Sequence, residues 1–169
     1  MDKVRELPNS KEAEESVLGA VISDPSKIDS ISNYLSFKDV FYTMKNQMLW
    51  DRVLEMHTKG SQIDMVTICN DLTKKDNQLG LDAYYITGLT SQYSGFVEEH
   101  AKKIYKKKLL RDLITQSRTI VETAYASNDV YPLLSESHTT IGRFIDLKPG
   151  HKQDLDDLLD ETMKSIENS

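Results

Sequence analysis

The chain has 169 residues, about the length of one domain with a short appendage. Its hydrophobic fraction of 38% and mean hydropathy of -0.49 are typical of amphipathic helices, some of which have apolar faces covered by another subunit. The formal net charge of -6 argues against DNA or anionic lipid as a partner, a single cysteine excludes an internal disulfide, and no run approaches the roughly 20 apolar residues of a membrane span. We therefore expect a cytoplasmic, all-α protein without cofactor or metal.

The first predicted helix follows Pro8. Asn9 and Glu12 have the spacing of a capping box, which marks the start of a helix. Gly19 lies within the apolar stripe of this helix, where a glycine costs about 1 kcal/mol relative to alanine. The sequence therefore predicts that this helix packs closely against another element. The stripe at helical spacing consists of Ala13, Val17, Ala20 and Val21.

Further short helices are expected in residues 1–92. Caps and apolar spacing predict a helix after Asp24-Pro25, one from Lys45 to Lys59 that ends at Gly60, one capped by Asp64 and one from Leu81 to Leu89. The intervening "SFKDVFYT" is interpreted as an aromatic turn over the core. Together these elements predict a small orthogonal helical bundle, which we call the head.

A longer helix follows the head. Residues 96–125 contain neither Gly nor Pro, and their apolar residues keep helical spacing over about 45 Å. "SNDVYP" then turns the chain into a returning helix, so residues 93–147 are expected to form a long antiparallel hairpin. A hairpin covers one face of each helix, and the other is expected to meet a second copy. The residues expected to pack within or between copies are Ile120, Val121, Tyr125, Leu133, Ile141 and Phe144.

Residues 148–169 are expected to form a linker and a linker helix. The Pro-Gly pair in "LKPGH" separates this helix from the hairpin, and its apolar stripe has no evident partner in the chain. The stripe either folds back or docks on a partner, and the linker favours docking. The residues of the stripe are Leu155, Leu158, Leu159, Met163 and Ile166.

Enzymatic motifs are absent from the sequence. There is no GxxxxGK[ST] phosphate-binding loop and no HExxH, so we predict no catalytic, cofactor-binding or metal-binding residue. The four histidines are interpreted as surface residues, because they are scattered along the chain: His57, His100, His138 and His151.

Two clusters of side chains, one basic and one aromatic, each allow two interpretations. The basic run "KKIYKKKLLR" at 102–111 either follows a phosphate backbone or forms the solvated face of the long helix, and its spread around the helix favours the latter. The aromatic group either stacks on bases or packs in the core, and core packing is favoured. That group consists of Phe37, Phe41, Tyr42 and Trp50.

Several segments together resemble the N-terminal domain of the DnaB-type replicative helicases. The residues that carry the resemblance are "LPNSKEAEESVLGAVISDP" at 7–25, "DVFYTMKNQMLWDRVLEMHTKGSQIDMVTICNDL" at 39–72, "LGLDAYYITGL" at 79–89 and "FVEEHAKKIYKKKLLRDLI" at 96–114. Each is weak alone, and their order and spacing make the combination specific. The resemblance covers almost the whole chain.

The resemblance implies a non-catalytic module for assembly and docking. Domains of this family form a helical head and a hairpin, the hairpins pair into dimers, and three dimers form a collar on a hexameric helicase. The resemblance further implies docking of the primase C-terminal domain, and packing of the linker helix on the ATPase domain of the neighbouring subunit. Little direct binding to nucleic acid and none to membrane is expected.

Two rival interpretations remain open. A full helicase would continue beyond Ser169 into an ATPase core, so we expect this chain to be a fragment of one. The alternative is a stand-alone collar mimic that regulates or recruits a host replicative helicase. A second alternative is a DNA-binding module that uses the lysine run, although the net charge of -6 disfavours it.

Overall fold

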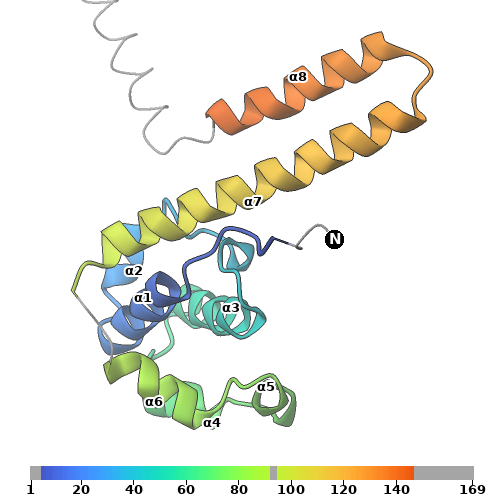
Figure 1. Ribbon diagram of the computed structural model, residues 1–169. Coiled ribbons are helices and arrows are strands. Elements are labelled where there is room, and N and C mark those ends of the chain that lie inside the picture. Colours follow the sequence, from blue (N-terminus) through green and yellow to red (C-terminus); the bar gives the residue numbers. More distant parts are fainter. Residues whose placement is uncertain (1–4, 92–94, 147–169) are drawn as a thin grey trace, which may run out of the picture. The chain divides into compact units, whose positions relative to one another are not determined.

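The computed structural model describes residues 5–91 and 95–146, apart from the side chains of residues 74, 75, 145 and 146. Within this part of the chain every regular element is a helix (Figure 1), which confirms the all-α class. The chain divides into two compact units, and the boundary lies inside α7, after Arg111. The elements are α1 (Lys11–Ser23), α2 (Lys27–Ile31), η1 (Lys38–Val40), α3 (Met44–Thr58), α4 (Met65–Asn70), α5 (Lys74–Gln78), α6 (Ala83–Ser91), α7 (Val97–Ala126) and α8 (Val130–Asp146).

α1 is the central helix of the first unit. All of its residues from Ser16 to Ile22 are buried, so it is covered on every side rather than along one stripe. It packs against α6, α3 and α2 (Figure 1). The stripe predicted from the sequence is buried, and Leu18 and Ile22 extend it around the helix.

Gly19 lies where α1 meets α6. A Cβ atom added at Gly19 would lie 2.1 Å from the backbone oxygen of Leu89, far inside any tolerated contact. The predicted close packing of α1 is therefore confirmed, and its partner is the backbone of α6.

Two of the predicted helix boundaries are confirmed and one is wrong. Asp64 caps α4 by accepting a hydrogen bond from the backbone N–H of Thr67 at 2.8 Å, and Gly60 follows α3 with φ 64°. The capping box at Asn9 does not form, because α1 begins at Lys11 and Asn9 lies one position before the N-cap; its side-chain amide donates to the carbonyl of Leu7 at 2.9 Å. Ser10 is the N-cap residue of α1, without a side-chain hydrogen bond.

The residues of the aromatic group lie partly in the core and partly on the surface. Phe41 and Trp50 are fully buried with their ring centroids 5.4 Å apart, and the indole N–H of Trp50 donates to the carbonyl of Leu35 at 3.0 Å. Core packing is thus confirmed for these two residues, and Tyr42 is half-buried. It is wrong for Phe37, which is 70% exposed because it lies just before η1, outside the core.

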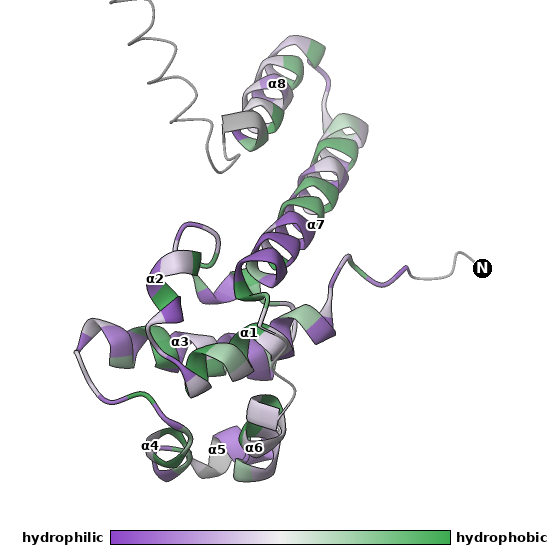
Figure 2. Ribbon diagram, turned by 90° about the vertical axis from the view of Figure 1, so that its left-hand side faces the viewer, coloured by the Kyte–Doolittle hydropathy of each residue, from purple (hydrophilic) through white to green (hydrophobic). Residues whose placement is uncertain are grey.

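The second unit contains the end of α7 and α8, joined by a turn at Ser127–Asp129. The carboxylate of Asp129 accepts a hydrogen bond from the N–H of Tyr131 at 3.1 Å at the start of α8. After the turn, α8 runs antiparallel to the end of α7 (Figure 1). No described side chain from Asp112 to Phe144 is buried, although hydrophobic residues recur along both helices (Figure 2). The second unit therefore has no core of its own.

A methyl group at Gly19 is expected to unfold the first unit more readily. The variant Gly19→Ala should lower the free energy of unfolding by about 2–3 kcal/mol in urea denaturation, because the backbones of α1 and α6 must separate. Gly88→Ala is the matched control, since nothing lies within 4 Å of a Cβ at that helical position. It should raise stability by up to about 1 kcal/mol through helix propensity. Equal effects of the two variants would contradict the close contact.

Candidate docking surfaces

A buried polar network ties α1, α3 and α6 together beneath one surface of the first unit. The carboxylate of Glu14, 1% exposed, accepts hydrogen bonds from the N–H of Tyr42 at 2.6 Å and the side-chain amide of Asn46 at 2.7 Å. The Tyr85 hydroxyl donates to the amide oxygen of Asn46. Burial, with the nearby charges of Glu15 and Glu14, raises the pKa of Tyr85 well above its ordinary range, so this hydroxyl remains a donor.

A hollow of about 500 Å³ lies beside α6, next to this network. The ammonium of Lys45 is 3.5 Å from the centroid of the Tyr85 ring, while the neighbouring Tyr84 is 90% exposed. An exposed aromatic side chain at the rim of a hollow is typical of a protein-binding surface. The lining residues are Glu15, Lys45, Tyr84, Tyr85, Thr87, Gly88, Leu89 and Ser91.

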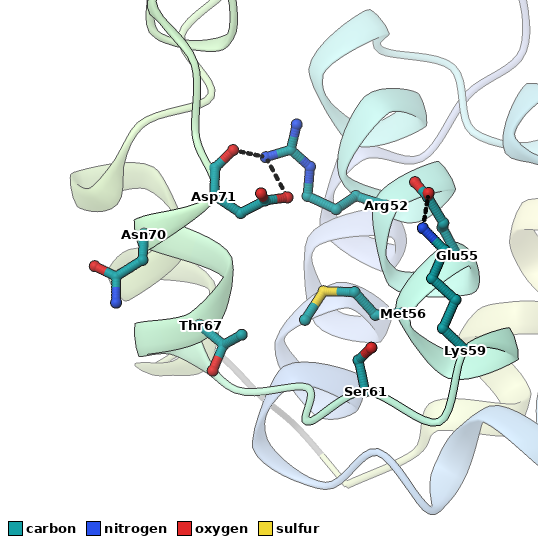
Figure 3. Close-up of a pocket in the computed structure, with 8 residues that line it drawn as sticks. All are labelled: Arg52, Glu55, Met56, Lys59, Ser61, Thr67, Asn70 and Asp71. Carbon is teal, nitrogen blue, oxygen red and sulfur yellow. Dashed lines mark hydrogen bonds and ion pairs between the residues drawn. The ribbon is translucent and has the colours of Figure 1, made fainter.

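A second hollow of about 470 Å³ lies between α3 and α4 (Figure 3). Figure 3 shows Arg52 reaching across it to Asp71, where it donates to the backbone carbonyl at 2.7 Å, and Glu55 paired with Lys59. Because these charged side chains satisfy one another, the hollow is a weaker candidate for a charged ligand than the surface beside α6.

Asp76 anchors the α4–α5 connection to α3. Its carboxylate is 3.2 Å from the guanidinium of Arg52 and accepts hydrogen bonds from the N–H of Thr73 at 2.7 Å and from the Thr73 hydroxyl at 2.8 Å. Burial alone would raise the pKa of Asp76, but the Thr73 hydrogen bonds and the Arg52 charge outweigh it and lower this pKa below its ordinary 3.8. Sequence analysis missed α5, whose start is fixed by this reciprocal Thr73–Asp76 cap.

The basic run on α7 is not one uniform face. Lys103 and Lys106 are exposed, as expected for a solvated face. Arg111 is buried, so it belongs neither to a phosphate-binding surface nor to a solvated face. Its guanidinium donates to the carbonyls of Pro8 at 3.0 Å and Val40 at 2.6 Å. This residue fastens α7 to the opening segment and to η1, and it is unavailable to a phosphate.

The six residues predicted to pack in the hairpin lie on the second unit, and none of them is fully buried. Three are half-buried, namely Ile120, Leu133 and Phe144, and three are exposed, namely Val121 (54%), Tyr125 (90%) and Ile141 (44%). Beside them on α7 is a mainly apolar hollow of about 470 Å³, lined by Leu113, Ile114, Ser117, Arg118, Val121 and Glu122. The stripe predicted for the linker helix, Leu155 to Ile166, lies outside the described residues.

Metal-binding and membrane-spanning features are not found in the described ranges. Within residues 5–91 and 95–146 no three His, Cys, Asp or Glu side chains gather as a metal site requires, and no helix has the length and apolar character of a membrane span. His57 is partly exposed, with Nε2 3.3 Å from the carboxylate of Asp29.

Comparison with known proteins identifies the family. Residues 6–106 match the model of the DnaB-like helicase N-terminal domain, so the chain belongs to this family and the resemblance seen in the sequence is confirmed. Replicative DNA helicase DnaC of Bacillus subtilis is 32% identical over 95% of this chain, and DnaB of Geobacillus stearothermophilus is 30% identical over 95%. The chain spans 36% of the length of each of these relatives.

Solved structures agree with the family. The N-terminal domain of DnaB helicase from Mycobacterium tuberculosis has a TM-score of 0.70 and 25% identity, covering 82% of this chain and 99% of that one. A DnaB-like replicative helicase, solved with its interactions with primase, has a TM-score of 0.67 and covers 95% of this chain and 35% of that one. At 18% identity the second likeness shows the fold alone.

The Asp76 anchor predicts a pH dependence. Because the folded pKa of Asp76 lies below 3.8, its ionised carboxylate stabilises the fold above that pH, and this contribution is lost as the pH falls through the folded pKa. Asp76→Asn should lower the free energy of unfolding by about 1–3 kcal/mol at pH 7 and lose less stability than the wild type between about pH 5 and pH 2.

Asp71→Asn is the control for this prediction. Its carboxylate also lies near Arg52, at 3.5 Å, but the side chain is 68% exposed. Urea denaturation across the pH range should show an effect below about 1 kcal/mol. Parallel pH profiles for wild type and Asp76→Asn would contradict the assigned role.

Proposed function

We propose that the chain is a non-catalytic assembly and docking module of a replicative DNA helicase, acting in the cytoplasm. The observation that carries the proposal is the second unit, where apolar residues recur on α7 and α8 and no described side chain is buried. Family membership of residues 6–106 supports the same role. Unwinding would require an ATPase domain outside the matched N-terminal domain.

The first part of the proposal is self-association through the hairpin. Exposed apolar residues on paired helices gain stability when a second copy covers them. We propose that Ile120, Val121, Tyr125, Leu133, Ile141 and Phe144 contribute to a dimer. Three such dimers would form the collar of the hexameric ring.

The second part is docking of a primase C-terminal domain on the head. The hollow beside α6 supports this role, because it combines an exposed tyrosine, Tyr84, with the Lys45–Tyr85 stack on a rigid polar network. The structural neighbour with described primase interactions shares the fold. Weak docking per copy suffices, since several copies in one ring raise the effective concentration of primase.

The third part is the linker helix. We propose that Leu155, Leu158, Leu159, Met163 and Ile166 dock on the ATPase domain of a neighbouring subunit. Its apolar stripe after a Pro-Gly linker supports this assignment.

Self-association is tested by light scattering over a hundredfold range of protein concentration. The wild type should reach the mass of a dimer or its multiples, and Val121→Glu should raise the dissociation constant at least about tenfold, because it places a charge in an apolar contact. Val66→Glu is the matched control, since Val66 is 62% exposed on α4 in the first unit. A monomer at every concentration would refute the assembly role.

Primase docking is tested by calorimetric titration of a primase C-terminal domain into the chain. Tyr84→Ala should weaken binding about tenfold or more, as expected for an aromatic anchor. Phe37→Ala, which removes a 70% exposed ring outside the hollow, should leave the affinity within about twofold. Tight binding that neither variant affects would place the primase surface elsewhere, and no binding by the wild type would refute the docking role.

A further inference from the structure

Two opposite charges border the apolar hollow on α7. Arg118 and Glu122 line it together with Leu113, Ile114, Ser117 and Val121. Both charged side chains are exposed, and neither makes an ion pair or side-chain hydrogen bond within the described part of the chain. They are four residues apart on one helix, so they lie on the same face, one turn apart.

We infer that Arg118 and Glu122 set the register of self-association, each Arg118 pairing with the partner's Glu122. The inference rests on the proposed assembly through the hairpin and adds the residues that determine its alignment. It assigns the hollow to a second copy of this chain.

The charge pattern of the hollow favours a second copy over a different partner. A surface that binds a strongly acidic or basic partner presents mainly the opposite charge. This surface presents one positive and one negative side chain beside apolar residues, so it is complementary to itself. Two-fold symmetry brings the same patch of both copies together, as in most homodimers.

Electrostatics then selects among the possible alignments of two antiparallel α7 helices. A two-fold axis at Arg118 would bring two guanidinium groups together in an apolar contact, which is unfavourable. An axis at the level of residue 120, midway between the two charged residues, places Arg118 opposite the partner's Glu122. The symmetry then forms this pair twice. It also brings Val121, which is 54% exposed, into the contact close to the axis.

Charge reversal tests this pairing in the full chain by sedimentation equilibrium at 50 mM salt. Arg118→Glu and Glu122→Arg should each raise the dimer dissociation constant about tenfold, because two attractive contacts become repulsive. An equimolar mixture of the two single variants should associate nearly as tightly as the wild type, since each mixed pair restores both contacts. The double variant should do the same. At 0.5 M salt the differences should shrink.

The controls match the charge changes at exposed positions of the first unit. Lys103→Glu and Glu12→Arg change the net charge by the same amounts as the test variants and should shift the dissociation constant less than about twofold. Circular dichroism and thermal unfolding check that every variant folds.

The possible outcomes distinguish the pairing of Arg118 with Glu122 from self-association of the hairpin itself. Weakened single variants that neither the mixture nor the double variant restores would overturn the pairing. A dimer that charge reversal leaves unchanged would overturn the pairing and leave hairpin assembly standing. A wild-type chain that stays monomeric would overturn both.

Discussion

The contact between the backbones of α1 and α6 at Gly19 is the constraint on which the first unit depends. Only a residue without Cβ permits it, because the added atom would meet the Leu89 carbonyl at 2.1 Å. The approach of α6 also brings the Tyr85 hydroxyl to Asn46, whose amide donates to the buried carboxylate of Glu14. A charge inside a core is tolerated when its oxygens are satisfied, so the close helix contact and the buried network support each other.

The elements that depend on local chemistry could be predicted from the sequence. Asp64 and the uninterrupted run of α7 act through neighbours in the chain or through helical periodicity. Gly19 within an apolar stripe predicted a close contact, but not that its partner is Leu89 of α6. The predictions that were wrong concern the first residue of α1 and a side chain held by residues far away in the sequence. Asn9 has a cap-forming side chain, but α1 begins at Lys11 with Ser10 as its N-cap residue, so Asn9 lies one position too early. Arg111 is buried because its acceptors come from residues 71 and 103 positions away, which no periodicity reveals.

In the candidate docking surfaces, the exposed apolar residues of the hairpin could be predicted from the sequence, whereas the charged residues and Tyr84 could not. Exposed apolar side chains on the hairpin, such as Val121 and Tyr125, follow from helical spacing in a segment with little else to cover it. Arg118 and Glu122 resemble any solvated helix residues in the sequence, and only the hollow that they line distinguishes them. Tyr84 is equally ambiguous, since its neighbour Tyr85 packs inward and the two are distinguished only by burial.

The two units differ in where their stability comes from. The first unit buries its own core, so its fold does not require a second copy. In the second unit no described side chain is buried, so its helices depend on intrinsic helix propensity rather than on a core of their own. α7 belongs to both units, and Arg111 is the last buried position along it. If the second unit self-associates as proposed, its order rises with protein concentration, because covering exposed apolar residues with a second copy follows mass action. This division suits the proposed assembly and docking module, because the first unit has a core of its own and the second leaves apolar residues for a second copy to cover.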